Sequence, residues 1–573
     1  MALHEPLQVN NGTNRSTSSY GLALCISLVV LSLFRVYYVL HGPLDLSADE
    51  ALYWDCTRRL ELSYYSKGPL IVYLMYISTY LFGTSVFAIR VMAVILSFLS
   101  SVFLYKLVVD MYGTRCDMPI SREINTPNNM PIGRAINTSI GCVSYFRDPR
   151  FIAFLSAMLL QIIPLFATYS IVFTIDSPFV FFWILSLYLL WKAIDVKDRV
   201  MPKGGIKPRG GIILWVALGV SVGLGFQAKY IMAFFYVCAF LLFLAKDNRK
   251  WLKNPKPYLS FVISLAVFSP VIIWNMEHGW VTLKHTGGHA HLADGLRVSL
   301  QSFGEFIGSQ AGVVTPLLFV LIPVALFGLM RREKSLQSSF LFYFSIPVLA
   351  FFLLKSIQGK VQANWAMTGY LTGIVAFVRY YFFAGAGESP KIKGKHTGRL
   401  VYAAVIIALA VTVISHYPYV LELSPGVDPS AKLRGWKTLG DKVTSIYDEL
   451  RTRGQVFIFS DKYQLTGLLA FYVKDHPITY SINLGRRMNE YDMWPGINDV
   501  FHTVGQNPAH PVRTFGIFVT DGDSALSPIV ASAFDGCDKQ LVNTTEHDKL
   551  LRQTTIFICY NFKELHDKRA ETF

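Results

Sequence analysis

Residues 20–40 read YGLALCISLVVLSLFRVYYVL, and Arg35 is the only charged residue among them. A helix of about 20 apolar residues is long enough to cross the hydrocarbon core of a bilayer. Further apolar blocks of similar length follow along the chain, and basic stretches separate them. The sequence therefore predicts a polytopic helical membrane protein, and it excludes a soluble enzyme, a disordered protein and a fibrous protein.

The composition supports this prediction. Hydrophobic residues make up 52% of the 573 positions and charged residues only 16%, whereas soluble proteins contain about 25% charged residues. The net charge of +15 is concentrated in short loops between the apolar blocks. Because cytoplasmic loops of membrane proteins are enriched in Lys and Arg, we interpret the charge as a topology signal and expect no nucleic-acid partner.

Eleven stretches are expected to cross the membrane, and the excess of Lys and Arg in alternate loops orients them. The basic loops are placed in the cytoplasm, with an N-terminal tail at 1–19 and a polar insertion at 113–149 in a transmembrane domain at 20–418. Loop one (41–84), the turn at 169–177, the loop at 276–311 and the C-terminus are then outside. The expected spans are 20–40, 85–109, 150–168, 178–194, 211–228, 230–246, 258–275, 312–330, 337–355, 364–383 and 400–418.

From about residue 425 the composition changes to that of a soluble domain. Short β-rich runs alternate there with helical stretches, which predicts a small α/β domain at 425–573 outside the membrane. Cys537 and Cys559 both lie in this region, and they are able to pair if the compartment is oxidising. The predicted strands are 456–460, 478–481, 515–520 and 555–560, and the predicted helices are 438–451 and 466–473.

Loop one contains an informative polar motif, LSADEALYWD at 46–55. Ser47 followed three residues later by Glu50 is a capping-box pattern, so we expect a helix with Asp49 and Glu50 in its first turn. The simpler interpretation is that these carboxylates only complement the helix dipole. The segment is amphipathic and follows a span directly, so we expect it to lie flat at the membrane interface with its carboxylates at headgroup level.

A second carboxylate, Asp176, stands in a short connection between two spans. Its simpler role is a helix N-cap, yet a carboxylate at this depth needs water or a partner. The topology places Asp176 on the same side as Asp49, so both can face one outer cavity. Lys67 and Lys229 are expected on that side too. Interfacial lysines often only extend toward water, but beside two carboxylates they are candidates for a phosphate clamp.

Taken together, these segments resemble the polyprenyl-phosphate-sugar-dependent glycosyltransferases of the GT-C fold. The branch is the one that contains the protein O-mannosyltransferases and the lipid A aminoarabinose transferase. The resemblance runs from about residue 20 to about 500 without the insertion, and it departs at Gly68, where relatives more often have proline. The matching segments are DEALYW (49–54), YYSKGPL (64–70), TIDSP (174–178), GLGFQAKY (223–230), DPSAKLRGW (428–436) and GRRMNEYDMW (485–494).

The resemblance implies a membrane domain of the GT-C type, with about eleven transmembrane helices plus interfacial helices. It also implies transfer of a sugar from a polyprenyl-phosphate carrier to an acceptor on the outer face, with inversion at the anomeric carbon. Asp49 is the expected general base. Asp176 and Glu50 complete the expected catalytic set, Lys67 and Lys229 are expected to bind the donor phosphate, and Tyr53, Tyr64, Tyr65 and His285 are expected to bind substrate.

Several points stay open at this stage. No cofactor is certain: the carboxylates suit a divalent cation such as Mg²⁺ or Mn²⁺, but some members of the group need none. The spacing of His285, His289 and His291 also suits a metal ion, although histidines in loops are usually solvated. The sugar is open, and the acceptor is a lipid, a glycan or a protein. The outer C-terminal segments resemble those of bacterial relatives, which implies a bacterial inner membrane.

The alternative function is a lipid-linked sugar flippase or an anionic-solute transporter, and a third is a non-catalytic scaffold. Transporters tend to place ionisable residues near mid-membrane and often contain repeated halves. Here the carboxylates fall at span ends on one side, and the sequence shows no repeat. A scaffold leaves the carboxylates and lysines without a role. These observations favour the transferase.

Overall fold

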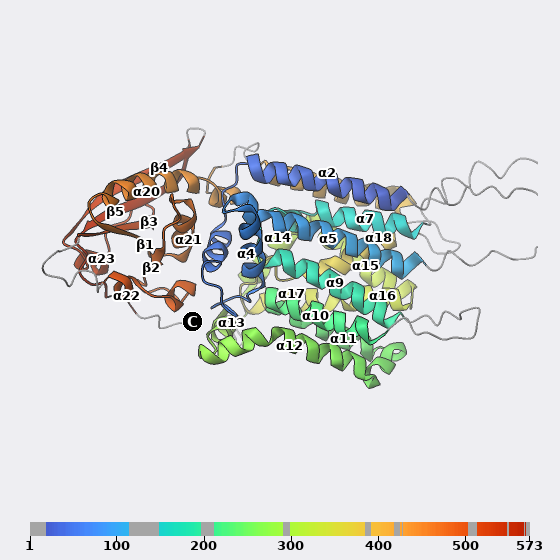
Figure 1. Ribbon diagram of the computed structural model, residues 1–573. Helices are drawn as coiled ribbons and strands as arrows, with labels where there is room; N and C mark the ends of the chain where they lie inside the picture. Colours follow the sequence, from blue (N-terminus) through green and yellow to red (C-terminus); the bar gives the residue numbers. More distant parts are fainter. Residues whose placement is uncertain are drawn as a thin grey trace, which may run out of the picture.

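The computed structural model describes residues 19–113, 148–195, 211–289, 298–383, 391–417, 424–426, 428–501, 513–546, 549–566 and 568. The predicted N-terminal tail and the insertion at 113–149 lie almost wholly outside these residues. Figure 1 shows two parts: a bundle of roughly parallel helices, and a smaller domain with a β-sheet at one end of the bundle, coloured orange and red.

A helix occupies each of the eleven predicted spans, and the protein is a multi-pass membrane protein. Two of the spans are bent pairs, formed by η2 and α11 (Tyr230–Leu244) with η3 (Lys246–Lys253) at 118°, and by α14 (Leu300–Val314) with α15 (Pro316–Arg332) at 94°. Six are long and apolar enough to cross a membrane alone: α2 (Ser19–His41), α5 (Val86–Tyr112), α9 (Asp176–Ile194), α12 (Pro255–Glu277), α16 (Leu336–Tyr343) continued by α17 (Ile346–Gln358), and α19 (Lys395–His416).

Three predicted spans are shorter than the sequence suggested. They are α7 (Pro149–Ile162), α10 (Ile212–Ala228) and α18 (Met367–Phe382). The predicted span at 150–168 divides at Ile163, because Pro164 cannot donate the hydrogen bond that would continue α7. A separate short helix, α8 (Pro164–Thr168), follows. Hydropathy alone did not show this break because both pieces are apolar.

The helices differ in how they are surrounded. In α2, α12 and α19 only 28% of the most apolar stretch is buried, and large side chains such as Leu33 and Ile406 are exposed. In α9 the buried share is 67%. Apolar side chains that face outward on a long helix are typical of contact with lipid, so α2, α12 and α19 form the lipid-facing periphery.

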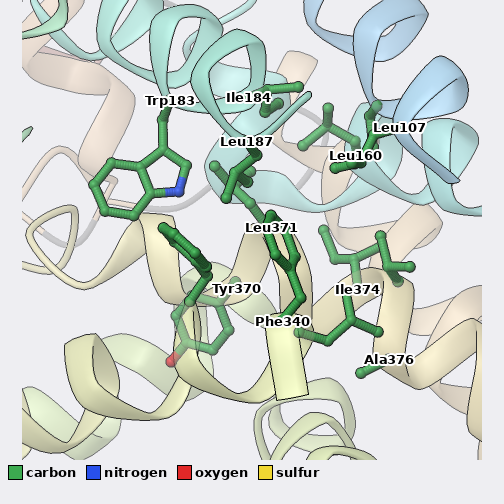
Figure 2. Close-up of a cluster of buried hydrophobic side chains, with 14 of the residues drawn as sticks. Leu107, Leu160, Trp183, Ile184, Leu187, Phe340, Tyr370, Leu371, Ile374 and Ala376 are labelled. Carbon is green, nitrogen blue, oxygen red and sulfur yellow. The ribbon is translucent and has the colours of Figure 1, made fainter. Parts of the chain in front are cut away.

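The centre of the bundle is packed around α9 and α18. Figure 2 shows Trp183, Ile184 and Leu187 of α9 meeting Leu371 and Ile374 of α18. All five side chains are almost completely buried. Since this core is apolar and close-packed, it holds the outer ends of the helices at fixed positions, and these ends carry the polar residues of loop one and of the turn at 169–177.

Loop one contains the helix predicted at its capping box, α3 (Ala48–Cys56), and a second helix, α4 (Leu70–Phe82). We expected α3 to lie flat at the membrane interface, which stays a prediction; the sequence did not indicate that α3 would be covered by another part of the chain. Every residue of α3 from Glu50 to Cys56 is buried, because α21 (Tyr463–Tyr472) of the C-terminal domain packs directly against it. Gly467 of α21 permits this approach, since a Cβ there would lie 3.1 Å from the backbone nitrogen of Leu52.

The C-terminal domain is built on one mixed sheet with the strand order β2-β1-β3-β5-β4. Strand β1 runs parallel to both β2 and β3, whereas β5 runs antiparallel to β3 and β4. Helices α20 (Trp436–Arg451) and α21 pack against the sheet. The strands are β1 (Gln455–Ser460), β2 (Thr479–Ser481), β3 (Thr514–Asp521), β4 (Gly536–Glu546) and β5 (Lys549–Tyr560).

Cys537 and Cys559 form a disulfide that joins β4 to β5. The two residues are direct partners in the ladder between these strands. The sequence left this pairing open, and the sheet register accounts for it. Strand β4 was not predicted, because it lies at the edge of the sheet and its sequence, GCDKQLVNTTE, is mostly polar.

Hydrogen bonds fix the C-terminal domain to loop one. The Asp45 carboxylate accepts the backbone N–H of Trp436 at 2.8 Å, at the start of α20. The Tyr491 hydroxyl donates to Asp55 Oδ2 at 2.8 Å. The Glu490 carboxylate accepts the backbone N–H of Tyr65 at 2.8 Å. These contacts place the sheet domain directly over the polar end of the bundle.

Candidate active site

The first turn of α3 holds the two neighbouring carboxylates that the sequence singled out. The predicted capping box is confirmed: Glu50 donates its backbone N–H to Ser47 Oγ at 3.2 Å, and its carboxylate accepts the backbone N–H of Ser47 at 2.9 Å. This cap fixes where α3 begins. It also fixes the directions in which Asp49 and Glu50 leave the helix.

Glu50 is fully buried and every position around its carboxylate is occupied. Arg90 of α5 donates to both oxygens, at 2.8 and 2.9 Å, and Phe173 donates its backbone N–H at 2.9 Å. With Ser47 these donors fill the four lone-pair positions of a carboxylate. Glu50 has no free position for a substrate or a proton. These bonds link α3, α5 and the turn at 169–177, and of the roles expected for Glu50 they favour holding the loop in position.

Asp49 differs from its neighbour. Its side chain is half-buried, and within the described part of the chain its carboxylate forms no hydrogen bond or ion pair. Tyr53 lies one turn further along α3, and burial together with the negative charges of Asp49 and Asp176 raises the pKa of Tyr53 far above its ordinary value. Burial and the negative charge of Asp49 also raise the pKa of Tyr463, at the start of α21. Asp49 is thus an available base in a partly enclosed space.

Asp176 begins α9 and forms a buried ion pair with Lys229. Lys229 Nζ donates to Asp176 Oδ1 at 2.6 Å, and Asn364 Nδ2 donates to Asp176 Oδ2 at 2.7 Å. The side chains of Asp176 and Lys229 are only 4% and 8% exposed. The ammonium group carries three N–H donors, and among the described residues it hydrogen-bonds to Asp176 alone. Lys229 therefore keeps donors that a ligand could use.

Lys67 provides a second cation next to α3. Its Nζ donates to the Tyr53 hydroxyl at 2.6 Å and lies 5.1 Å from the centroid of the Tyr53 ring. The position that follows Lys67 is glycine, where a Cβ would overlap the backbone carbonyl of Gln227. Gly68 therefore lets loop one contact the end of α10 two residues before Lys229.

The other expected substrate-binding residues lie elsewhere in loop one. Tyr64 is buried, and its hydroxyl links the backbones of Arg59 and Glu61, so it shapes the loop. The rings of Tyr65 and His285 lie with their centroids 4.8 Å apart and are tilted by 57° to one another. Tyr65 belongs to a separate apolar cluster with Trp274. The structure therefore brings Asp49, Tyr53, Lys67, Asp176 and Lys229 together, whereas Tyr64, Tyr65 and His285 surround a neighbouring part of the loop.

The side chains at this site are a poor match for a bound divalent cation. In the ranges that the structure describes, no three His, Cys, Asp or Glu residues gather in a way that could hold a metal ion. Asp176 is already paired with Lys229, which supplies positive charge at the place where a cation would be needed. His291 and the side chain of His289 lie outside the described residues, so the His spacing noted in the sequence has no structural counterpart here.

Comparisons with known proteins show what this chain is similar to. The family model of dolichyl-phosphate-mannose-protein mannosyltransferases matches residues 66–117 and 144–274, which include Lys67, Asp176 and Lys229. The lipid A galacturonosyltransferase RgtD of Rhizobium johnstonii is 25% identical over 355 residues, which are 61% of this chain. The match spans 64% of the length of that relative.

The solved structures are more distant in sequence and similar over nearly the whole chain. ArnT from Cupriavidus metallidurans, in a crystal structure with bound undecaprenyl phosphate, has a TM-score of 0.58 at 13% identity. The match covers 96% of this chain and all of that one. The chain has the GT-C fold. The apo state of the same ArnT gives a TM-score of 0.54 at 12% identity, over 94% of this chain and 98% of that one.

Three residues of this GT-C site were not singled out in the sequence. Asn364 precedes α18 in a short polar stretch, and an Asn at the outer end of a span was a usable signal. Arg90 lies inside an apolar span, where a charged side chain needs a partner of opposite charge, so it too was a usable signal. Tyr463 reaches the site only because α21 docks on α3, so nothing in its local sequence could have shown it.

Proposed function

We propose that this protein is a membrane glycosyltransferase that moves a hexosyl or pentosyl unit from a polyprenyl-phosphate carrier to an acceptor on the outer face of the membrane. The observation that carries the proposal is that, among the described residues, the Asp49 carboxylate has no partner while Lys67 and Lys229 each keep N–H donors that are not used. The names of the relatives support it, since one transfers a sugar to lipid A and another was crystallised with a polyprenyl phosphate.

The proposed reaction is a single displacement with inversion. The acceptor hydroxyl gives its proton to Asp49 while its oxygen forms a bond to the anomeric carbon of the donor. The bond from that carbon to the phosphate oxygen breaks, and the polyprenyl phosphate leaves with the bonding electron pair. A positioned general base contributes about 10²–10⁴-fold to the rate. Because a phosphate leaves readily, the main remaining demand is to stabilise the charge that develops on it.

Lys67 and Lys229 meet that demand in this proposal. Both donate from an ammonium group at the outer end of the bundle, where a lipid carrier would present its phosphate. Asp176 and Asn364 hold Lys229 in position and neutralise it while the site is empty. Asp176 is therefore proposed as a positioning residue rather than as a second base. No metal is needed for this scheme, and we expect a chelator to leave the rate unchanged.

The C-terminal domain and loop one are proposed to lie on the outer side of a bacterial inner membrane. The disulfide between Cys537 and Cys559 supports this side, because disulfides persist in oxidising compartments. Basic residues at the opposite ends of the helices support it too. They include Arg150, Lys192, Lys253, Arg331 and Lys395, at the starts or ends of five helical elements.

The test is sugar transfer by the purified full chain in proteoliposomes. A panel of radiolabelled polyprenyl-phosphate sugars is supplied with a bacterial lipid extract as acceptor, with and without a chelator. We expect a labelled product with the wild type and almost none with Asp49→Asn at matched expression. If the labelled carrier instead crosses the bilayer unchanged, equally with both proteins, the transferase is contradicted and the flippase is supported.

A further inference from the structure

A pocket of about 190 Å³ lies where loop one meets the C-terminal domain, and none of its lining residues belongs to the proposed catalytic set. This volume exceeds what a lone ordered water needs. Three parts of the chain build its walls. Loop one supplies Arg59, strand β2 and the residue after it supply residues 479–482, and the segment that ends the GRRMNEYDMW motif supplies Tyr491 and Trp494.

The lining combines aromatic rings with flat polar groups. The guanidinium carbon of Arg59 lies 4.2 Å from the centroid of the Trp494 ring. Arg59 Nη1 and Trp494 Nε1 are both buried and lack a hydrogen-bond partner among the described residues, and the nearest charge to Arg59 is Asp55 at 3.9 Å. Buried donors in a native protein are normally satisfied. Arg59 and Trp494 therefore bring to the pocket wall donors that no described residue uses.

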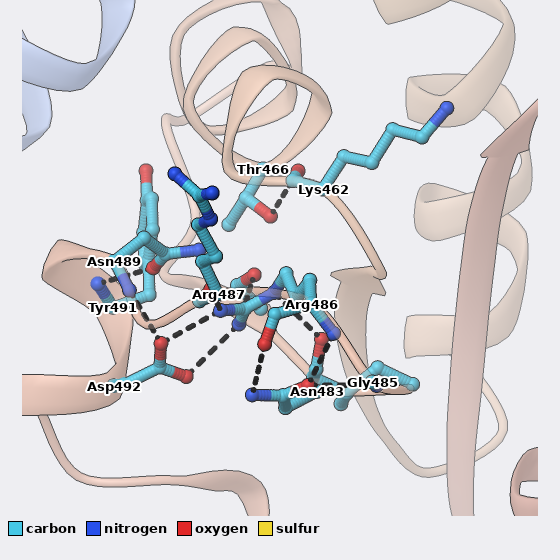
Figure 3. A network of polar contacts seen from close by, with 11 residues as sticks. Lys462, Thr466, Asn483, Gly485, Arg486, Arg487, Asn489, Tyr491 and Asp492 are labelled. Carbon is cyan, nitrogen blue, oxygen red and sulfur yellow. Dashed lines mark hydrogen bonds and ion pairs between the residues drawn. The ribbon is translucent and has the colours of Figure 1, made fainter. Parts of the chain in front are cut away.

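The walls are held in place before any ligand arrives. Figure 3 shows Arg486 reaching Asp492, to which it donates at 2.6 and 2.9 Å. Arg486 also donates to Ser481 Oγ at 3.0 Å, so it joins strand β2 to the loop that carries Tyr491. Asn489 and Asp492 form a capping box that fixes the turn between them. A pocket braced in this way is preformed, as binding sites for small ligands usually are.

The charge in the pocket favours a neutral ligand. Arg59 contributes one positive charge, and Asp499 contributes one negative charge while accepting the backbone N–H of Gly496 at 2.7 Å. A phosphate would face that carboxylate. A sugar ring instead presents an apolar face to aromatic rings and neighbouring hydroxyls to Arg, Asn and Asp side chains, which form paired hydrogen bonds.

We infer that this pocket binds one neutral sugar ring of a glycan-bearing acceptor. The identification of that sugar as part of the acceptor rests on the proposed transferase function. The position is suitable, because the Tyr491 hydroxyl in the pocket wall donates to Asp55 of α3. Asp55 lies in the same helix as Asp49, about 9 Å along the axis at ~1.5 Å per residue. A sugar in the pocket would therefore present the adjoining part of its glycan to Asp49.

Binding can be measured without any transfer reaction. The full chain in detergent micelles is mixed with the methyl glycosides of glucosamine, N-acetylglucosamine, galactose and mannose, and saturation-transfer difference NMR reports which ring protons contact the protein. We expect at least one glycoside to bind to the wild type and equally to Asp49→Asn. Arg59→Gln and Trp494→Tyr are expected to weaken that binding about tenfold.

Arg58→Gln is the matched control. Arg58 is the neighbouring arginine, but it donates to Asp55 at 2.8 Å and to the backbone carbonyl of His476 at 2.8 Å, and it does not line the pocket. Its loss disturbs the same interface more than the loss of Arg59 does. Glycoside binding that survives Arg58→Gln and falls in Arg59→Gln supports the pocket.

Two results would overturn the inference: no glycoside of the panel binds, or binding is the same in Arg59→Gln and Trp494→Tyr as in the wild type. Failure of the transferase proposal gives a different pattern, in which glycoside binding persists and depends on Arg59, yet no donor sugar is ever transferred. Once a donor is known, Arg59→Gln is expected to raise the KM for the acceptor about tenfold. The KM for the donor and kcat should change little.

Discussion

Asp49 and Glu50 are consecutive carboxylates in one helical turn, and the structure gives them different surroundings. Glu50 is fully buried and accepts four hydrogen bonds, two of them from Arg90. Asp49 is half-buried and, among the described residues, accepts none. A carboxylate whose lone pairs are all occupied can only hold structure together, whereas an unoccupied one at a partly enclosed surface can take a proton. Adjacent positions on α3 therefore place their carboxylates in different surroundings.

The cations repeat this difference. Arg90 donates to Glu50 and to the backbone carbonyls of Leu44 and Asp45, so four of its five N–H donors are used in shaping loop one. Lys229 and Lys67 each have one hydrogen-bond partner among the described residues and keep further donors. The ion pair between Arg90 and Glu50 holds loop one in place, whereas Lys67 and Lys229 keep donors that no described residue accepts. The following experiments test this contrast, beginning with the largest expected effect.

Asp49→Asn is expected to lower kcat by about 10²–10⁴-fold, because it removes the proposed general base while keeping the shape of the side chain. Its thermal unfolding temperature should equal that of the wild type, since Asp49 has no partner to lose within the described residues. Initial rates of sugar transfer and a thermal unfolding curve in detergent measure both quantities. A normal rate in Asp49→Asn would remove the distinction between the two carboxylates.

Arg90→Leu is expected to lower the free energy of unfolding by about 3–5 kcal/mol, because it leaves the buried Glu50 carboxylate without its cation. The control is the double variant Glu50→Leu/Arg90→Leu, which removes both charges and should recover part of the loss. Chemical denaturation of the purified chain in detergent compares them. If the single and double variants were equally destabilised, the ion pair would not be what holds α3 to α5.

Lys67→Gln is expected to raise the KM for the polyprenyl-phosphate donor by about 10–100-fold, because one hydrogen bond from a charged donor to the phosphate is lost. Lys442→Gln, which changes an exposed lysine on α20, should behave like the wild type. Donor titrations at a fixed acceptor concentration provide both constants. An unchanged KM for Lys67→Gln would show that Lys67 serves only to hold Tyr53.

Another buried carboxylate, Glu490, gives the smallest expected effect. It accepts the Tyr65 backbone N–H, and burial raises its pKa from 4.5 to about 8. Between these values the unfolded chain releases a proton that the folded chain retains, so stability falls as the pH rises from about 4.5 to 8. Glu490→Gln should remove this loss and unfold about 2 °C higher than the wild type at pH 8.

The measurement is the unfolding temperature of Glu490→Gln and the wild type across pH 5 to 8.5. The advantage of the variant should grow with pH. Glu449→Gln, which changes an exposed glutamate on α20, is the control and should follow the wild-type curve. Parallel curves for Glu490→Gln and the wild type would show that Glu490 is not held protonated in the fold.

Much of the architecture was predictable because its signals are local. Apolar blocks located the helices of the bundle, the Ser47–Glu50 spacing located the start of α3, and alternating short runs indicated a C-terminal α/β domain. Polar strand β4 and the break at Pro164 were missed, because an edge strand carries little apolar pattern and a broken helix keeps the hydropathy of a whole one.

The sequence by itself determined which residues were candidates: a carboxylate or a lysine near the end of an apolar span is costly there and needs a reason. It identified Asp49, Glu50, Lys67, Asp176 and Lys229 on that basis. Only the tertiary structure decided which of them are occupied. Arg90 lies 40 positions after Glu50 in the chain, and Lys229 lies 53 positions after Asp176. Pairing over such separations depends on how the helices pack, and no local pattern records it.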